Sequence, residues 1–145
     1  MKPNKNIGEQ TVSKFESKYN VWELFSLKDR VAIVTGGASG LGFDMASALA
    51  EAKADAVITS RNLAKGQRAA ERISNETGRK TLPLTLDVTK EDEVIQMVDS
   101  VLEEVGKIDI LVNNAGEMKG VTKEDAPFEV RPLKEWKLYK VGVIF

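Results

Sequence analysis

Four short apolar runs punctuate the chain, at residues 31–34, 56–60, 82–86 and 108–112, and turn residues bound them. Runs of this length and composition predict β-strands. The first run is continuous and rich in β-branched residues, which predicts a strand buried on both faces. Pro83 lies within the third run and favours an edge position for it, because proline cannot donate a hydrogen bond to a neighbouring strand.

Helical spacing of apolar residues fills the segments between these runs. It predicts helices over residues 40–52 and 63–77, and a third helix through residues 94–105. Strands that alternate with helices are typical of βαβ units, and therefore of a parallel sheet in an α/β fold. The third helix has the clearest apolar stripe, which consists of Val94, Met97, Val98, Val101, Leu102 and Val105.

Capping residues support these helix limits. Asn62 is a candidate N-cap, and Gly78 and Gly106 follow the ends of the second and third helices. Thr89 and Asp92 resemble a capping box with aspartate in place of glutamate, which predicts that they cap the third helix.

The ends of the chain differ from this regular middle. Residues 1–20 are polar and predict a poorly ordered arm, and a short apolar segment, 21–27, follows them. We expect Trp22 and Trp136 to be packing anchors. The expected organisation is one domain over residues 21–128, followed by an aberrant tail over 129–145.

Composition narrows the functional classes. The 145 residues carry a net charge of −1, which gives no reason to expect nucleic acid or an anionic membrane as a partner. Cysteine and histidine are both absent, so we expect no disulfide, no metal site and no catalysis by histidine. No apolar run approaches a membrane span, and the polar first residues do not resemble a signal or transit peptide. The expected location is the cytoplasm.

The most informative motif is the glycine-rich segment 35–42, Thr-Gly-Gly-Ala-Ser-Gly-Leu-Gly, between the first strand and the first helix. Glycines in such a turn let backbone N–H groups approach a pyrophosphate, and the helix N-terminus adds its positive dipole end. The order strand, glycine turn, helix therefore predicts a dinucleotide site. The alternative interpretation is a tight strand-to-helix connection without a ligand.

The spacing of this motif, Thr-Gly-x-x-x-Gly-x-Gly, resembles the cofactor motif of the short-chain dehydrogenase/reductase family. Three further segments stand where that family has its own motifs: Asp87-Val88 after the third strand, residues 113–116 (Asn-Asn-Ala-Gly) after the fourth, and residues 24–28 before the first. The resemblance covers residues 24–116. Taken alone, Asp87 could be a turn residue and 113–116 a solvated loop.

The resemblance implies a Rossmann-like parallel sheet with helices on both faces and about four strands in the order 3-2-1-4, which is half of a doubly wound fold. It also implies an oxidoreductase that interconverts alcohol and carbonyl groups with NAD(P)(H). The expected cofactor-binding residues are Gly36, Ser39, Gly40, Leu41, Gly42, Ser60, Arg61, Asp87, Val88, Asn114, Ala115 and Gly116.

Ser60 and Arg61 bear on which cofactor is bound. An acidic residue at the end of the second strand would accept hydrogen bonds from the adenosine ribose and repel a 2′-phosphate. Here Ser60 holds that place, and the guanidinium of Arg61 can pair with a phosphate. The sequence therefore favours NADP over NAD. The alternative is that Arg61 is a solvated residue at the helix start.

The catalytic pair of the family, Tyr-x-x-x-Lys, does not occur in this sequence. Glu23 and Val143 stand four residues after the two tyrosines, Tyr19 and Tyr139. Lys53 also stands where the family usually has a glycine, which predicts a strained left-handed residue.

The sequence therefore leaves several interpretations open. In the first interpretation the chain is the cofactor-binding part of an NADP-dependent oxidoreductase, either truncated or a fragment of a longer protein. By itself it would lack catalytic residues, and an alcohol or carbonyl substrate would bind only to the full-length parent. Alternatively, it is a non-catalytic nucleotide-binding or interaction module, or a non-functional fragment. The open edge of the fourth strand, at residues 108–112, could support self-association.

Overall fold

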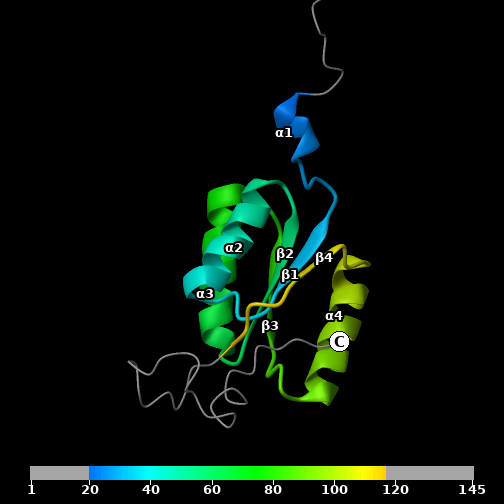
Figure 1. Cartoon of the computed structure of the whole chain (residues 1–145). Helices are drawn as coiled ribbons and strands as arrows, with labels where there is room; N and C mark the ends of the chain where they lie inside the picture. The colour runs from blue at the N-terminus through cyan, green and yellow to red at the C-terminus, as the bar shows by residue number, and fades with distance from the viewer. Residues whose placement is uncertain (1–19, 117–145) are drawn as a thin grey trace, which may run out of the picture.

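The computed structural model of the chain describes residues 20–116 (Figure 1). The predicted arm over 1–20, except Asn20, and the tail over 129–145 lie outside the described residues, as does Trp136. The elements are α1 (Val21–Leu24), β1 (Val31–Val34), α2 (Gly40–Glu51), β2 (Asp55–Ser60), α3 (Leu63–Thr77), β3 (Thr81–Thr85), α4 (Glu91–Val105) and β4 (Ile110–Val112).

The four strands form one parallel sheet in the order β3-β2-β1-β4, which confirms the predicted Rossmann-like α/β fold. Strand limits differ slightly from the prediction: β3 is shifted by one residue toward the N-terminus and β4 begins at Ile110 rather than at residue 108. Pro83 lies in the edge strand β3, as expected.

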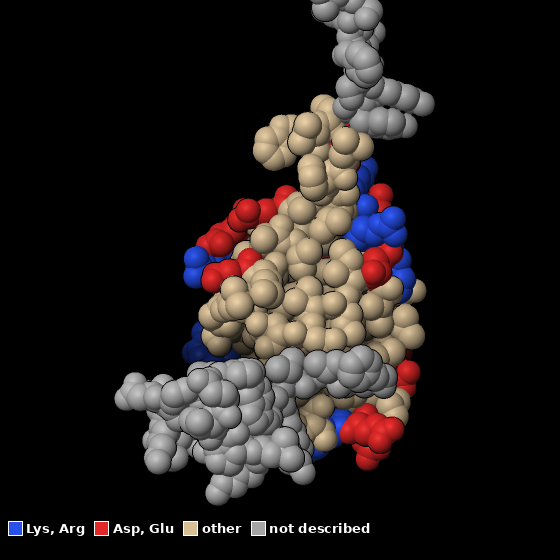
Figure 2. Space-filling model, in the orientation of Figure 1, with Lys and Arg blue, Asp and Glu red and all other residues tan. Residues whose placement is uncertain are grey.

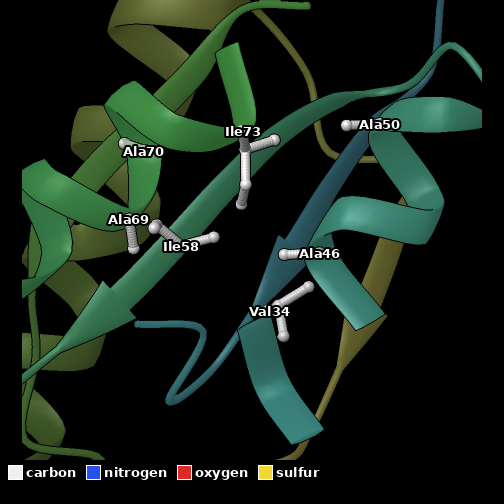
Figure 3. Close-up of a cluster of buried hydrophobic side chains, with 7 residues drawn as sticks. All are labelled: Val34, Ala46, Ala50, Ile58, Ala69, Ala70 and Ile73. Atoms are coloured by element: carbon white, nitrogen blue, oxygen red, sulfur yellow. The ribbon is translucent and has the colours of Figure 1, made fainter. Parts of the chain in front are cut away.

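Helices cover both faces of the sheet, with α2 and α3 on one side and α4 on the other (Figure 1). Successive strand residues point to opposite faces, so Val34 and Ile58 pack toward α2 and α3. Figure 3 shows these two side chains among Ala46, Ala50 and Ile73 and the two alanines of α3. Small side chains on the helices let both of them approach the sheet closely.

The opposite face holds a second core between the sheet and α4. Ile33 and Val57, which alternate with the residues of the first core, pack here with Met97 and Val101 of α4. This confirms most of the predicted apolar stripe of α4. Leu102 is the exception, because 45% of it is exposed. It lies toward the side of α4 that the sheet does not cover.

The predicted caps are confirmed for α3 and partly wrong for α4. The side chain of Asn62 accepts a hydrogen bond from the backbone N–H of Lys65, and Gly78 and Gly106 are left-handed C-caps. The capping box of Thr89 and Asp92 does not form, because Lys90 is the N-cap and Thr89 lies one residue too early to cap the helix. The Thr89 hydroxyl donates instead to Asp87.

The structure confirms the prediction for Lys53 and contradicts the one for Trp22. Lys53 has a φ of 83°, which confirms the predicted left-handed residue after α2. Trp22 is 84% exposed, so the expectation that it anchors the packing is wrong. It lies in α1, a four-residue helix with no buried residue (Figure 1).

No described strand pairs with the outer edge of β4, where Leu111 is 54% exposed. Figure 2, in the orientation of Figure 1, shows uncharged side chains across the middle of the molecule, between charged groups on both flanks. The predicted open edge is therefore present in the described part of the chain. None of the helices within residues 20–116 is long and apolar enough to cross a membrane.

Candidate functional site

A cavity of about 610 Å³ lies at the carboxyl ends of the strands. Ligands of open α/β sheets bind at this edge, at the point where the strand order reverses. In this sheet that point lies between β1 and β4. Every predicted site residue except Gly40 lines the cavity. Sequence reasoning missed five lining residues: Ala38, Asn62, Lys65, Leu86 and Thr89.

The start of α2 forms one wall of the cavity. Ser39 is the N-cap of this helix, but its side chain makes no capping hydrogen bond. The exposed Ser39 hydroxyl and the first amides of α2 therefore remain available to an anion. Gly40 has a φ of +55°, and a Cβ built on it would meet no heavy atom within 4 Å. Gly40 thus faces open space.

Gly42, two residues further along α2, is instead packed tightly. A Cβ on Gly42 would lie 2.4 Å from both the Asn114 side-chain nitrogen and the Gly36 carbonyl oxygen. Only glycine lets α2 approach the turns after β1 and β4 this closely. The two glycines therefore differ in role: Gly42 brings the backbone segments together, while Gly40 borders open space and does not line the cavity.

Thr35 and Asn114 join the turns after β1 and β4. The buried Thr35 hydroxyl accepts hydrogen bonds from the backbone N–H groups of Asn114 and Ala115, both at 3.0 Å. It also donates to the Val112 carbonyl at 3.3 Å. The Asn114 side-chain amide donates to the Thr35 carbonyl at 2.9 Å. These bonds hold the two central turns of the site at a fixed separation.

Ser60 and Arg61 lie at the end of β2. The Ser60 hydroxyl accepts a hydrogen bond from the Asn62 backbone N–H at 3.2 Å, and the Ser60 carbonyl accepts one from Leu86. The hydroxyl hydrogen of Ser60 can still be donated to a ligand. Arg61 follows Ser60 in the chain and is exposed.

Asp87 follows β3 and is held by its neighbours. Hydrogen bonds from the backbone N–H and the hydroxyl of Thr89 lower its pKa, so it is ionised at neutral pH. Thr89 occupies one of the two oxygens, Oδ1. Glu93 of α4 accepts a hydrogen bond from the Asp87 backbone N–H at 2.8 Å, and Lys90 pairs with Glu93. The turn interpretation of Asp87 therefore holds alongside its place in the cavity.

Charged side chains of both signs line the cavity. Among its described lining residues, Asp87 is the carboxylate, while Arg61 and Lys65, one and five residues after Ser60, are the cations. Within residues 20–116 no cluster of aspartate or glutamate could hold a metal ion. The cavity thus combines the N-terminus of α2, which no side chain caps, with the cations Arg61 and Lys65 and the carboxylate of Asp87.

The sequence of residues 30–139 matches the family described as short chain dehydrogenase. The chain belongs to this family. The resemblance inferred from the motifs is therefore confirmed.

Individual relatives agree with this assignment. Over 89 residues the chain is 45% identical to the peroxisomal 2,4-dienoyl-CoA reductase of Danio rerio, an alignment that covers 61% of this chain and 30% of the relative. The solved structure of a short-chain type dehydrogenase/reductase from Mycobacterium marinum is similar with a TM-score of 0.70 and 34% identity. That alignment covers 86% of this chain and 48% of the other.

A gluconate 5-dehydrogenase from Burkholderia cenocepacia, solved in complex with NADP and tartrate, is similar with a TM-score of 0.69 and 34% identity. It matches 84% of this chain, which covers 46% of the dehydrogenase. The chain therefore spans under a third of the curated relative above and under half of each solved structure.

Proposed function

We propose that the chain is the NADP(H)-binding part of an oxidoreductase that interconverts alcohol and carbonyl groups. The observation that carries this proposal is the cavity at the sheet edge, which the uncapped N-terminus of α2, the cations Arg61 and Lys65 and the carboxylate of Asp87 line together. The nicotinamide ring of a bound cofactor would supply or accept the hydride. The residues of this chain would bind and orient the cofactor.

The start of α2 would hold the pyrophosphate. Gly40 leaves space for it, and the exposed hydroxyl of Ser39 can donate to a phosphate oxygen. The ionised Asp87 carboxylate can accept a hydrogen bond from the exocyclic amine of adenine, and Val88 lines the cavity beside it. The turn with Asn114, Ala115 and Gly116 would line the cofactor from the side of β4.

The preference for NADP rests on Ser60 and Arg61. Neither can repel a 2′-phosphate as a carboxylate would, and a guanidinium can form two parallel hydrogen bonds to it. The NADP that is bound to the Burkholderia relative supports the same choice.

Titration of the purified chain with NADPH and with NADH, followed by nucleotide fluorescence, tests this proposal. We expect tighter binding of NADPH, and we expect Arg61→Ala to weaken NADPH binding by about 10- to 100-fold, because one charge-assisted contact contributes about 1.5–3 kcal/mol. Arg68→Ala, which removes an exposed arginine of α3 outside the cavity, is the matched control. Equal affinities for the two nucleotides would contradict the cofactor assignment.

The alternative function is a nucleotide-binding or interaction module without catalysis of its own. Two observations favour keeping it: the 145 residues contain no Tyr-x-x-x-Lys, and the edge of β4 is open in the described part of the chain. Under this alternative, nucleotide binding persists and no turnover accompanies it.

A further inference from the structure

The first turn of α4 carries three acidic residues, Glu91, Asp92 and Glu93. Acids are favourable in the first turn of any helix, because they complement the positive end of its dipole. Glu91 and Asp92 are exposed, whereas the Glu93 side chain is only 32% exposed. Glu93 does not line the cavity, but it contacts a residue that does. Its contact therefore needs an explanation beyond the helix dipole.

The place of Glu93 in the helix favours a different partner from the one that it has. Lys90 is the N-cap of α4, so Glu93 is the third helical residue. A glutamate at this position commonly accepts a hydrogen bond from the backbone N–H of the N-cap residue. Here the Lys90 N–H donates instead to the Asp87 carbonyl at 3.0 Å, and Glu93 accepts the Asp87 N–H at 2.8 Å. Glu93 thus binds the turn that precedes the helix rather than the helix end.

This turn, which begins at Asp87, is fixed at several points. The Asp87 carbonyl accepts the Lys90 N–H, and Oδ1 accepts both the N–H and the hydroxyl of Thr89. Val88 packs against the core between the sheet and α4. The bonds from Lys90 and Thr89 form within the turn and move with it. The bond from Glu93 is different, because it ties the Asp87 backbone to the body of α4.

Lys90 in turn holds Glu93. Its ammonium lies 2.7 Å from Oε1 of Glu93, while Oε2 accepts the Asp87 N–H, so the two carboxylate oxygens have separate partners. The hydrogen bond from Lys90, and then that from the Asp87 backbone, lower the pKa of Glu93. Glu93 is therefore ionised at neutral pH, and both of its hydrogen bonds are charge-assisted.

We propose that Glu93 is a positioning residue for adenine recognition: by holding the Asp87 backbone N–H, it fixes the Asp87 carboxylate where that group can accept the exocyclic amine of adenine. This inference rests on the proposed NADP(H) binding. Glu93 acts through Asp87 and does not itself touch the nucleotide. The adenine end of the cavity is then set by α4 as well as by the strand ends.

The test compares Glu93→Ala with the unmodified chain by calorimetric titration with two probes: NADPH, and its analogue in which hypoxanthine replaces adenine. The analogue carries an oxygen in place of the exocyclic amine, so it cannot donate that hydrogen bond to Asp87. We expect the unmodified chain to prefer NADPH by about tenfold. Glu93→Ala should weaken NADPH by about tenfold and leave the analogue within about twofold, so that the preference disappears.

Two further variants separate positioning from a general effect on the helix. Glu93→Gln keeps an oxygen that can accept the Asp87 N–H, so it should retain most of the preference for adenine. Glu91→Ala removes an exposed acid from the same helical turn and is the matched control, with both affinities expected to stay within about twofold. Thermal unfolding of each variant establishes that it is folded.

The outcomes distinguish this inference from the function on which it rests. If Asp87→Ala removes the preference for adenine but Glu93→Ala keeps it, the role of Glu93 is wrong and the proposed function stands. Equal weakening of both probes in Glu93→Ala would also overturn it, as would a Glu93→Gln variant as impaired as Glu93→Ala. If the unmodified chain binds NADPH better than NADH but does not distinguish adenine from hypoxanthine, only this inference fails. If it binds neither probe, both proposals fail.

Discussion

The hydroxyl of Thr35 and the backbone N–H of Asn114 are 3.0 Å apart, and this hydrogen bond joins the ends of two strands that are distant in the sequence. The Asn114 side chain returns a second bond, to the Thr35 carbonyl, at 2.9 Å. Gly42 of α2 packs against the same amide. One buried hydroxyl thus sets the geometry of the glycine-rich turn and of the turn after β4 together.

Replacement of Thr35 by valine should destabilise the chain by about 2–4 kcal/mol, because two backbone N–H groups lose their buried acceptor. Valine keeps the shape of threonine, so the loss reports on hydrogen bonds rather than on packing. Thr35→Ser keeps the hydroxyl and should cost considerably less. Urea unfolding measures both, and equal losses for the two variants would contradict this role.

Gly40→Val should abolish nucleotide binding while the chain stays folded. The valine side chain would occupy the space that the pyrophosphate needs, and its left-handed φ of +55° would add about 1–2 kcal/mol of strain. Fluorescence titration with NADPH measures the loss. Normal binding by this variant would show that the phosphates do not lie at this turn.

Lys53→Gly is the matched control for that variant, because it changes the other end of α2. Lys53 has a φ of 83°, and glycine relieves its left-handed strain. We expect unchanged nucleotide binding and a gain of about 0.5–1 kcal/mol in the free energy of unfolding. A loss of binding in Lys53→Gly would mean that α2 transmits changes along its length.

Asp109 should give the stability of the chain an acid-sensitive component. Hydrogen bonds from the Arg30 side chain and the Val31 backbone, at 2.8 and 2.9 Å, lower the pKa of Asp109 to about 2 from an ordinary value of 3.8. Because the folded pKa lies below the unfolded one, this contribution is fully present above pH 3.8 and is lost as the pH falls toward 2.

The measurement is the difference in unfolding free energy between the unmodified chain and Asp109→Asn across this pH range. We expect the difference to be constant near neutral pH and to shrink between about pH 4 and pH 2. Asp99→Asn, on the exposed side of α4, removes the same charge without these contacts and serves as the control. A difference that does not change with pH would contradict the assignment.

We expect the open edge of β4 to support self-association of the chain, and we expect Leu111→Lys to weaken it. Leu111 is 54% exposed on β4, whose outer edge no described strand covers, and lysine on a strand edge opposes pairing. Loss of one buried leucine from a contact costs about 1.5–3 kcal/mol, or about 10- to 100-fold in the association constant. Sedimentation velocity over a range of concentrations checks this. Leu63→Lys, on α3, is the control, and equal effects would point away from the β4 edge.

A polypeptide of these 145 residues should bind NADPH without oxidising it in the presence of ketones or sugars. Hydride transfer to a carbonyl needs a positioned proton donor, and neither Tyr-x-x-x-Lys nor histidine occurs in the sequence. Loss of general acid–base catalysis alone costs about 10²–10⁴-fold in rate. Turnover by monodisperse protein that disappears in Gly40→Val would sink this prediction.

Local signals in the sequence predicted most of the secondary structure. The helix α3 was predicted with its observed limits because Asn62 and Gly78 act on backbone groups a few residues away. Periodicity identified the buried faces for the same reason, since which face a residue joins depends on strand and helix geometry alone. The failure at Thr89 arose because the capping motif identifies residue types but not which residue becomes the N-cap.

The site depended on contacts that no local pattern contains. Thr35 was recognised only as part of a motif, and its hydrogen bonds to Asn114 span 79 residues. Lys65 lines the cavity from the first turn of α3, next to Gly66, which lies near Pro83 of β3 and Ser60 of β2. The sequence by itself determined the elements, the glycine turn and the family, because these follow from short-range geometry and motif spacing. The tertiary structure decided which side chains share the cavity, because the parallel sheet brings the carboxyl ends of β1, β2, β3 and β4 to one edge.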